Sequence, residues 1–250
     1  MRGPTSERKM CGRFYQNQQL AEWKGISDLI PRQLHFDGMD NIGPTDRATI
    51  ITRPGGQFQT IGATFWLIPE YLEKREDAFK AATFNAKSET IFQLPSFRKP
   101  IIHRRCLIPT WGFYEANGPA KFKQPWFFHL KNGEPMVFAG IYTEWWTKPF
   151  LASNNEFSFS IITVPANALV AKYHAKKRMP VILRKEQFER WTHPDLQHTD
   201  EISSFFKIFP EEEMDVYPVS KELFKGLKGD RCIERIQLPI NEPPEELSLF

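Results

Sequence analysis

The chain is poor in cysteine, with only Cys11, Cys106 and Cys232 among 250 residues, and no two of them have C-x-x-C spacing. So few cysteines, odd in number, exclude a disulfide framework and a zinc knuckle and indicate a reducing compartment. No apolar run approaches the roughly 20 residues that span a bilayer. Residues 1–9 carry charges without a following apolar segment. The sequence therefore predicts a soluble, cytoplasmic protein without a bound metal or cofactor.

Aromatic residues and proline are plentiful: the chain has 22 Phe, 7 Trp, 6 Tyr and 20 Pro. The aromatic bulk is enough to bury a sizeable core, and the prolines favour short elements over long helices. The sequence also contains no internal repeat. We therefore expect one compact, monomeric domain.

Charge is distributed unevenly along the chain. Residues 1–190 hold 27 Lys and Arg against 17 Asp and Glu, whereas residues 191–250 hold 6 against 13. The basic body suits a polyanionic partner, although scattered cations are also typical of ordinary solvated surface. The acidic end would then lie away from that partner.

Short β-rich runs bounded by turn residues predict the strands, and sparser periodic patterns predict three helices. The strands are Thr49–Thr52, Phe58–Trp66, Trp126–Leu130, Met136–Tyr142 and Phe157–Thr163, and the helices are Tyr71–Ala82, Ala166–Tyr173 and Lys185–Thr192. Strands without regular strand–helix alternation favour an α+β fold with largely antiparallel sheets. We expect an open, barrel-like core with short flanking helices over residues 11–237, a leader over 1–10 and a disordered tail over 238–250.

Cys11 directly follows Met10, so a chain that starts at Met10 and loses that methionine begins with cysteine. An N-terminal cysteine carries a thiol and an α-amine two carbons apart, and both groups titrate near physiological pH. With an aldehyde the amine forms an imine, and the thiolate then closes a five-membered thiazolidine. An internal cysteine cannot do this, so the chemistry depends on the leader being absent.

Three further segments carry polar chemistry. Asn85–Glu89 offers an amide, a cation, a hydroxyl and a carboxylate, although alone it is typical of a polar turn. Glu115 ends an aromatic run, where desolvation would suit it to donate and accept protons; the alternative is a rim carboxylate paired with Arg104 or Arg105. His174 lies in the most basic segment, although a lone histidine is more often structural.

Five motifs in order identify the chain as resembling the SOS-response-associated peptidase (SRAP) family. They are Met-Cys-Gly-Arg-Phe, Asn-Ala-Lys-Ser-Glu, Arg-Cys-Leu-Ile-Pro with Gly-Phe-Tyr-Glu, Phe-Ala-Gly-Ile, and His followed by Arg-Met-Pro-Val-Ile-Leu, within residues 11–220. The resemblance implies a basic cleft for single-stranded DNA and a mature N-terminal cysteine that crosslinks to the ring-opened aldehyde of an abasic site. It also implies autopeptidase removal of the leader, abasic-site lyase activity, a role in DNA repair and the SOS response, and a nucleoid-associated location.

The resemblance assigns roles residue by residue. Cys11 matches the crosslinking cysteine, Asn85 the asparagine that positions its amine, Glu115 the acid that moves protons, and His174 the histidine that assists opening of the deoxyribose. For DNA binding it implies phosphate contacts from Arg13, Lys87 and Arg178, and stacking or wedge surfaces from Pro44, Trp66, Met179 and Pro180. The chain departs from the family pattern at Lys87 and Ala116, and three residues separate His174 from Arg178.

Two other functions remain open from the sequence: a cysteine peptidase that cleaves other proteins, and a non-catalytic binder of single-stranded DNA. A further motif lies at the extreme end, Glu246-Leu247-Ser248-Leu249-Phe250. It resembles the pentapeptide with which bacterial replication and repair proteins dock on the sliding clamp, with glutamate at the first position. The alternative is a frayed end that packs back on its own domain.

Overall fold

The computed structural model describes residues 12–30, 36, 40–117, 124–146 and 155–238. Cys11, the leader over residues 1–10 and the clamp-like motif therefore lie outside the described residues, as does all of the predicted tail except Leu238. The strands are β1 Arg13–Tyr15, β2 Asn41–Ile42, β3 Arg47–Thr52, β4 Gln59–Phe65, β5 Asn85–Lys87, β6 Arg105–Thr110, β7 Gly112–Asn117, β8 Gln124–Leu130, β9 Met136–Trp146, β10 Asn155–Pro165, β11 Arg178–Pro180, β12 Ile182–Leu183 and β13 Met214–Pro218.

The helices of this part of the chain are all short. The α-helices are α1 Lys24–Ser27, α2 Arg75–Ala78, α3 Pro100–His103, α4 Ala168–Ala171, α5 Phe188–Thr192 and α6 Thr199–Ser203. The 3-10 helices are η1 Gln18–Glu22, η2 Pro54–Gly56, η3 Lys185–Gln187, η4 Glu211–Glu213, η5 Lys221–Lys225 and η6 Asp230–Cys232. The expected α+β class with short flanking helices is confirmed.

The larger sheet forms a five-stranded barrel. Strand pairing runs from β10 through β4, β3, β6 and β9 and returns to β10, and only the β10–β4 pair is parallel. β5 and β11 extend the barrel beside the C-terminal part of β10, at Ile161–Thr163 and Thr163–Pro165 respectively. These two additions place β5 and β11 at the same end of the barrel.

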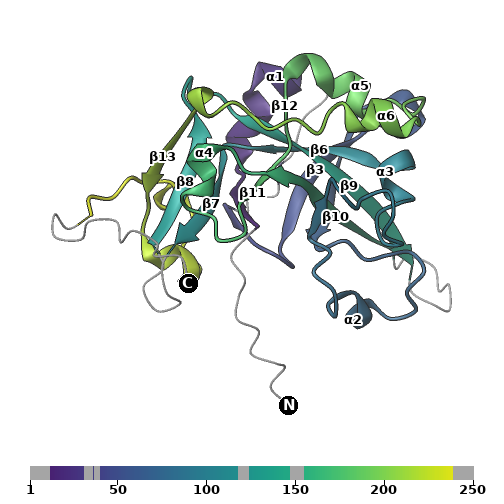
Figure 1. Cartoon of the computed structure of the whole chain (residues 1–250), viewed down its shortest axis with the longest axis horizontal. Helices are drawn as coiled ribbons and strands as arrows, with labels where there is room; N and C mark the ends of the chain where they lie inside the picture. Colours follow the sequence, from purple (N-terminus) through teal and green to yellow (C-terminus); the bar gives the residue numbers. More distant parts are fainter. Residues whose placement is uncertain (1–11, 31–35, 37–39, 118–123, 147–154, 239–250) are drawn as a thin grey trace.

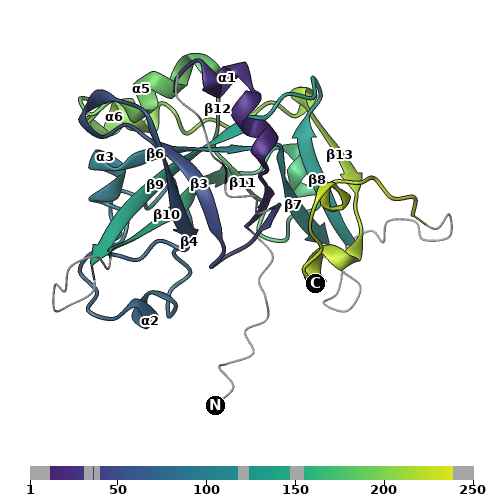
Figure 2. The same ribbon diagram turned by 180° about the vertical axis from the view of Figure 1, so that it is seen from behind.

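The second sheet is antiparallel, in the order β13-β8-β7-β1-β2, and it lies beside the barrel (Figure 1). Helices α5 and α6 lie at the top of the barrel in this view, α4 is drawn over β7 and β8 of the second sheet, and β11 lies between the two sheets. The view from behind shows β1 between β7 and the barrel (Figure 2). The first strand of the chain therefore lies at the junction of the two sheets.

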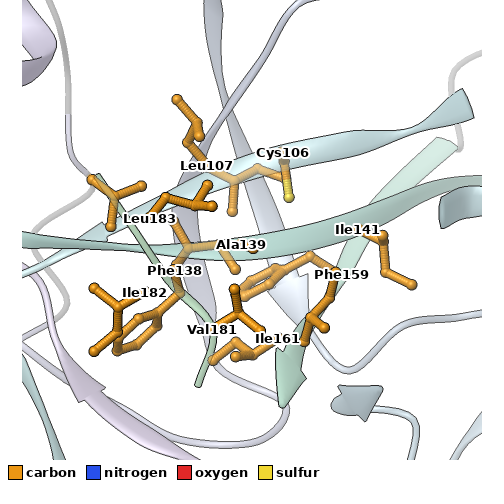
Figure 3. Close-up of a cluster of buried hydrophobic side chains, with 14 of the residues drawn as sticks. Cys106, Leu107, Phe138, Ala139, Ile141, Phe159, Ile161, Val181, Ile182 and Leu183 are labelled. Atoms are coloured by element: carbon orange, nitrogen blue, oxygen red, sulfur yellow. The ribbon is translucent and has the colours of Figure 1, made fainter. Parts of the chain in front are cut away.

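The core fills the barrel with branched and aromatic side chains. Figure 3 shows Phe138 and Ala139 of β9 with Phe159 and Ile161 of β10, all of them buried. Phe14 of β1 packs edge-on against Phe65, Phe138 and Phe159, with ring centroids 5.5–6.4 Å apart. An aromatic side chain of β1 thus packs into the barrel core.

Gln16, the residue directly after β1, anchors this strand to the barrel. Its Nε2 donates to the carbonyl oxygens of Thr49 (2.9 Å) and Pro109 (2.8 Å), and its Oε1 accepts from the Thr49 N–H (2.8 Å). The side chain is buried. Three hydrogen bonds from one buried amide therefore tie β1 to both β3 and β6.

The predicted helix Tyr71–Ala82 is wrong apart from the four residues of α2. The indole of Trp145 donates to the Leu72 carbonyl (2.9 Å), and the indole of Trp66 donates to the Ala78 carbonyl (3.0 Å). Tertiary donors thus satisfy backbone groups that a longer helix would satisfy internally. The other two predicted helices correspond to α4 and to η3 with α5, and the five predicted strands lie in β3, β4, β8, β9 and β10.

Gln16→Ala is expected to lower the free energy of unfolding by about 3 kcal/mol, because it removes three buried hydrogen bonds at roughly 1 kcal/mol each. The measurement is urea unfolding followed by tryptophan fluorescence. Gln19→Ala, at an exposed position in η1, is the matched control and should change stability by less than about 0.5 kcal/mol. Equal stabilities for the two variants would contradict the role given to Gln16.

Candidate active site

A pocket lies where β1, β5, β7 and β11 meet at one end of the barrel. Its lining residues are Gly12, Arg13, Asn85, Phe113, Glu115, Phe138, Ile161, Thr163, His174, Arg178, Met179 and Pro180. Seven of the residues singled out in the sequence are among them, although they come from segments far apart in the chain. The structure thus brings Asn85, Glu115 and His174 together, with Arg13, Arg178, Met179 and Pro180 around them.

Glu115 and His174 face each other across the junction of the sheets. Glu115 lies on β7, and His174 lies in the turn between α4 and β11. The His174 Nε2 is 3.7 Å from the Glu115 Oε2, and the two side chains are 2% and 6% exposed. The alternative of a rim carboxylate is wrong, since Glu115 is buried, Arg104 pairs with Glu70 and Glu144, and Arg105 donates to backbone carbonyls.

A backbone hydrogen bond fixes the tautomer of His174. The N–H of Arg178 donates to the Nδ1 of His174 at 2.6 Å, so Nδ1 carries a lone pair and the proton of the neutral ring is on Nε2. The three-residue spacing between these residues closes this contact through a turn in which Lys177 has φ +49°. Nε2–H therefore points toward Glu115.

The surroundings of His174 oppose its protonation. Burial, followed by the positive charges of Lys176 and Arg178, lowers the pKa of His174 to about 4. The ring is consequently neutral at physiological pH. It can donate a hydrogen bond through Nε2, but it is a poor site for a full positive charge.

Gly12 is required by the backbone that enters β1. Its φ is +135°, and a Cβ there would lie 3.1 Å from the ring of Phe84 and 3.4 Å from that of Phe65. A residue with a side chain would be strained at this φ. The glycine that follows Cys11 in the sequence thus has a structural reason, whereas Cys11 itself is outside the described residues.

Arg13 is positioned by Asn41 and Gly43. Arg13 Nη1 donates to Asn41 Oδ1 (2.8 Å), and the Asn41 Nδ2 donates to the Leu223 carbonyl (2.7 Å). A Cβ on Gly43 would lie 2.8 Å from the Arg13 guanidinium carbon, so the guanidinium packs against that glycine. Sequence reasoning assigned no such role to Asn41 or Gly43, because no local pattern links them to residue 13.

Arg178 already has an acidic partner. Its guanidinium forms an ion pair with Glu89, in which Nη2 is 2.8 Å from Oε2, and Nη2 also donates to the Thr163 carbonyl (2.6 Å). This ion pair lowers the pKa of Glu89 to about 2. A role for Arg178 in binding phosphate stays a prediction, and it would require competition with Glu89.

The other predicted DNA contacts lie outside the pocket or at its edge. Lys87 is exposed on β5, two residues after Asn85, and Pro44 is half-buried. Trp66 is also half-buried, and its ring packs on Phe79 and Phe84. Met179 is only 1% exposed, so it offers a DNA strand little surface.

Within the described residues, no group of three or more His, Cys, Asp or Glu side chains could hold a metal ion. No helix in this part of the chain is long and apolar enough to cross a membrane.

Known proteins match this chain over most of its length. The model of the SOS response associated peptidase (SRAP) family matches residues 10–225, so the chain belongs to this family. The Bacillus subtilis abasic site processing protein YoqW is 32% identical over 216 residues, which cover 84% of this chain and 92% of YoqW. The abasic site processing protein YobE of the same organism is 31% identical, with coverages of 84% and 94%.

A solved structure has the same fold. A crystal structure of a protein from Bacteroides thetaiotaomicron is similar with a TM-score of 0.76 and 30% identity, and the match covers 91% of this chain and all of the other. The chain thus resembles YoqW and YobE in sequence and the Bacteroides protein in architecture, over most of its length.

The low pKa of His174 predicts a pH-dependent stability. An unfolded histidine binds a proton near its ordinary pKa of 6.5, whereas folded His174 does so near 4. Between these values the unfolded state binds more protons, so the free energy of unfolding falls as pH drops, by roughly 3 kcal/mol from this residue. His174→Gln should remove that part of the slope in urea unfolding measured across this range. An unchanged slope would contradict the buried, neutral state of His174.

Proposed function

We propose that this protein captures abasic sites in single-stranded DNA covalently, through a thiazolidine formed by Cys11 as the first residue of the mature chain. The observation that carries the proposal is the pocket at the start of β1, where Asn85, Glu115 and His174 meet next to Gly12. The names of YoqW and YobE support abasic-site processing as the activity.

The reaction joins an amine, a thiol and an aldehyde and releases one water. The α-amine of Cys11 attacks the C1′ aldehyde carbon of the ring-opened deoxyribose, and loss of water from the carbinolamine gives an imine. The thiolate then adds to the imine carbon, and the ring nitrogen takes up a proton. Both new bonds are to the same carbon, which makes the product more stable than an open imine.

Glu115 and His174 divide the proton transfers. Glu115 accepts a proton from the attacking amine and returns it to the departing hydroxyl, as a general base and then a general acid. His174 stays neutral and donates from Nε2 to an oxygen of the sugar, which helps the closed deoxyribose to open. The Asn85 amide orients the α-amine.

The α-amine exists only after the leader has left. Self-processing would add water to the Met10 carbonyl carbon, break the bond to the nitrogen of Cys11 and give that nitrogen a proton. Glu115 is our candidate for this step, because it is buried and directly follows Tyr114, which pairs with Arg13 of β1. The same group would then serve both cleavage and crosslinking.

Protein that begins at Cys11 is expected to form a one-to-one adduct with an abasic single strand, with a mass equal to the sum of the two less one water. Intact-mass spectrometry before and after incubation measures it. Cys11→Ala should give no adduct, and Cys11→Ser should give none of comparable heat stability. The double variant Cys106→Ala, Cys232→Ala is the control, because both of these thiols are buried. An adduct that survives Cys11→Ala would overturn the assignment.

Glu115→Gln is expected to slow crosslinking by about 10²- to 10⁴-fold, the usual effect of removing a general acid or base. His174→Ala should also slow it, whereas affinity for an intact strand should hardly change in either variant. Glu212→Gln, at an exposed position of η4, is the matched control. Crosslinking rates are measured by quenching the reaction at successive times and separating the adduct from the free strand on a gel. A parallel loss of strand affinity would indicate misfolding or a pure binding module.

Lys87→Ala should instead weaken strand binding and leave the crosslinking rate at saturation unchanged. Loss of one phosphate contact reduces the steepness of the slope of log K against log salt concentration by about 1. Lys207→Ala, exposed in the acidic C-terminal part, is the control. Fluorescence anisotropy at several salt concentrations measures both. The same salt dependence in Lys87→Ala and wild type would remove Lys87 from the interface.

We also propose that residues 246–250 dock on a bacterial sliding clamp. Leu247, Leu249 and Phe250 would enter an apolar pocket, and the Pro- and Glu-rich stretch before them would tether the basic domain near template DNA. A peptide of residues 238–250 should bind the clamp weakly, and deletion of Leu247–Phe250 should abolish binding without changing crosslinking. If the full-length protein does not bind the clamp at concentrations where an established motif peptide binds, clamp docking is ruled out.

A further inference from the structure

A second cavity lies at the opposite end of the barrel from the candidate active site. Its volume is about 400 Å³, within the range of roughly 300–1,000 Å³ that is typical of small-molecule sites. β10 runs from Phe157 at this cavity to Thr163 at the candidate active site, a separation of roughly 20 Å along the strand. The mouth of a β-barrel is a common place for a ligand site.

The wall of the cavity includes a buried hydroxyl group. Thr52 and Gln59 pair across β3 and β4, so their side chains lie on the same face, and both line the cavity. Thr52 is fully buried, and its Oγ1 has no hydrogen-bond partner among the described residues. Such a hydroxyl costs about 1–3 kcal/mol, which a ligand with a polar edge would offset.

Two aromatic side chains line the same cavity. Tyr142 on β9 and Phe157 on β10 are partly exposed and line the cavity. Tyr142 pairs with Phe159, and Phe157 pairs with Glu144, so the two rings are diagonal neighbours on one face. Each ring has an apolar face on which a planar ligand can stack.

Positive charge predominates at the rim. Arg53 and Arg104 line the cavity together with a single carboxylate, Glu144, and with the imidazole of His103. Arg104 is shared between Glu70 at 3.1 Å and Glu144 at 3.8 Å. Arg53 donates to the Gly56 carbonyl (3.0 Å) and forms no ion pair with the described part of the chain. The rim therefore favours an anionic group near Arg53 and His103.

We propose that this cavity binds a nucleotide, with the phosphate at Arg53 and His103 and the base against Tyr142 and Phe157. The Thr52 hydroxyl and the Gln59 amide supply hydrogen bonds for a polar edge of the base. A bare phosphate would leave the two aromatic side chains unused, and an apolar ligand would leave the cations and Thr52 unused. The proposal is independent of the chemistry at Cys11, because the two pockets share no residue.

Calorimetric titration of the full chain carrying Cys11→Ala with deoxyadenosine monophosphate tests the site. We expect one bound nucleotide per chain, and weaker binding of deoxyadenosine and of inorganic phosphate. Arg53→Gln should weaken binding by about tenfold or more, through loss of a charge-assisted hydrogen bond. Thr52→Val should weaken nucleotide binding by about fivefold, because it removes a neutral hydrogen bond. Arg98→Gln, an exposed arginine elsewhere, should leave it unchanged.

Thr52→Val also guards against a folding artefact, because replacing a buried hydroxyl that has no partner with a methyl group should not lower stability. No binding at millimolar nucleotide, or affinity that is unchanged in both Arg53→Gln and Thr52→Val, would overturn the proposal. So would backbone NMR shifts that centre on β11 and His174 instead of on Tyr142 and Phe157.

The nucleotide has two conceivable sources, a DNA strand and a free nucleotide. Binding of a single strand without abasic sites distinguishes them. If the strand supplies it, Arg53→Gln weakens strand binding and deoxyadenosine monophosphate competes with the strand. If a free nucleotide is the ligand, strand binding is the same in Arg53→Gln and wild type. Both outcomes require the monophosphate to bind, so they support the site and differ only in its source.

Discussion

The attachment of β1 to the barrel is the constraint on which the arrangement of the site depends. Gln16 makes three buried hydrogen bonds to β3 and β6, and Phe14 packs among barrel aromatics. On its other side β1 pairs with β7, which carries Glu115. A three-residue strand thus fixes the start of the domain between two sheets. Cys11, the nucleophile predicted from the sequence, stands two residues before the first residue of this strand in the chain.

Burial at the sheet junction determines the chemistry available there. The same desolvation that lowers the pKa of His174 leaves a neutral ring whose tautomer is set by one backbone N–H. A neutral donor beside a buried carboxylate suits stepwise condensation, in which protons move and no lasting charge forms. The ion pair of Arg178 with Glu89 holds a cation near the pocket while neutralising most of its charge.

Much of the fold could be predicted from the sequence, because alternation and turn residues mark strands locally. The run Phe58–Trp66 corresponds to β4, and Phe157–Thr163 lies within β10. The helix over Tyr71–Ala82 could not be corrected locally, since indoles of Trp66 and Trp145 satisfy its carbonyls. The convergence of Asn85, Glu115 and His174 was expected from the family resemblance alone. The link from Asn41 to Arg13 depends on contacts between distant segments, which no local pattern encodes.

A crystal structure of the adduct between protein beginning at Cys11 and an abasic single strand tests the central claim most directly. The account predicts one sugar carbon bonded to both the nitrogen and the Sγ of Cys11. It also predicts Glu115 and the Nε2 of His174 within hydrogen-bond distance of the reacted group. A link through another side chain, or a reacted carbon remote from Glu115 and His174, would contradict it.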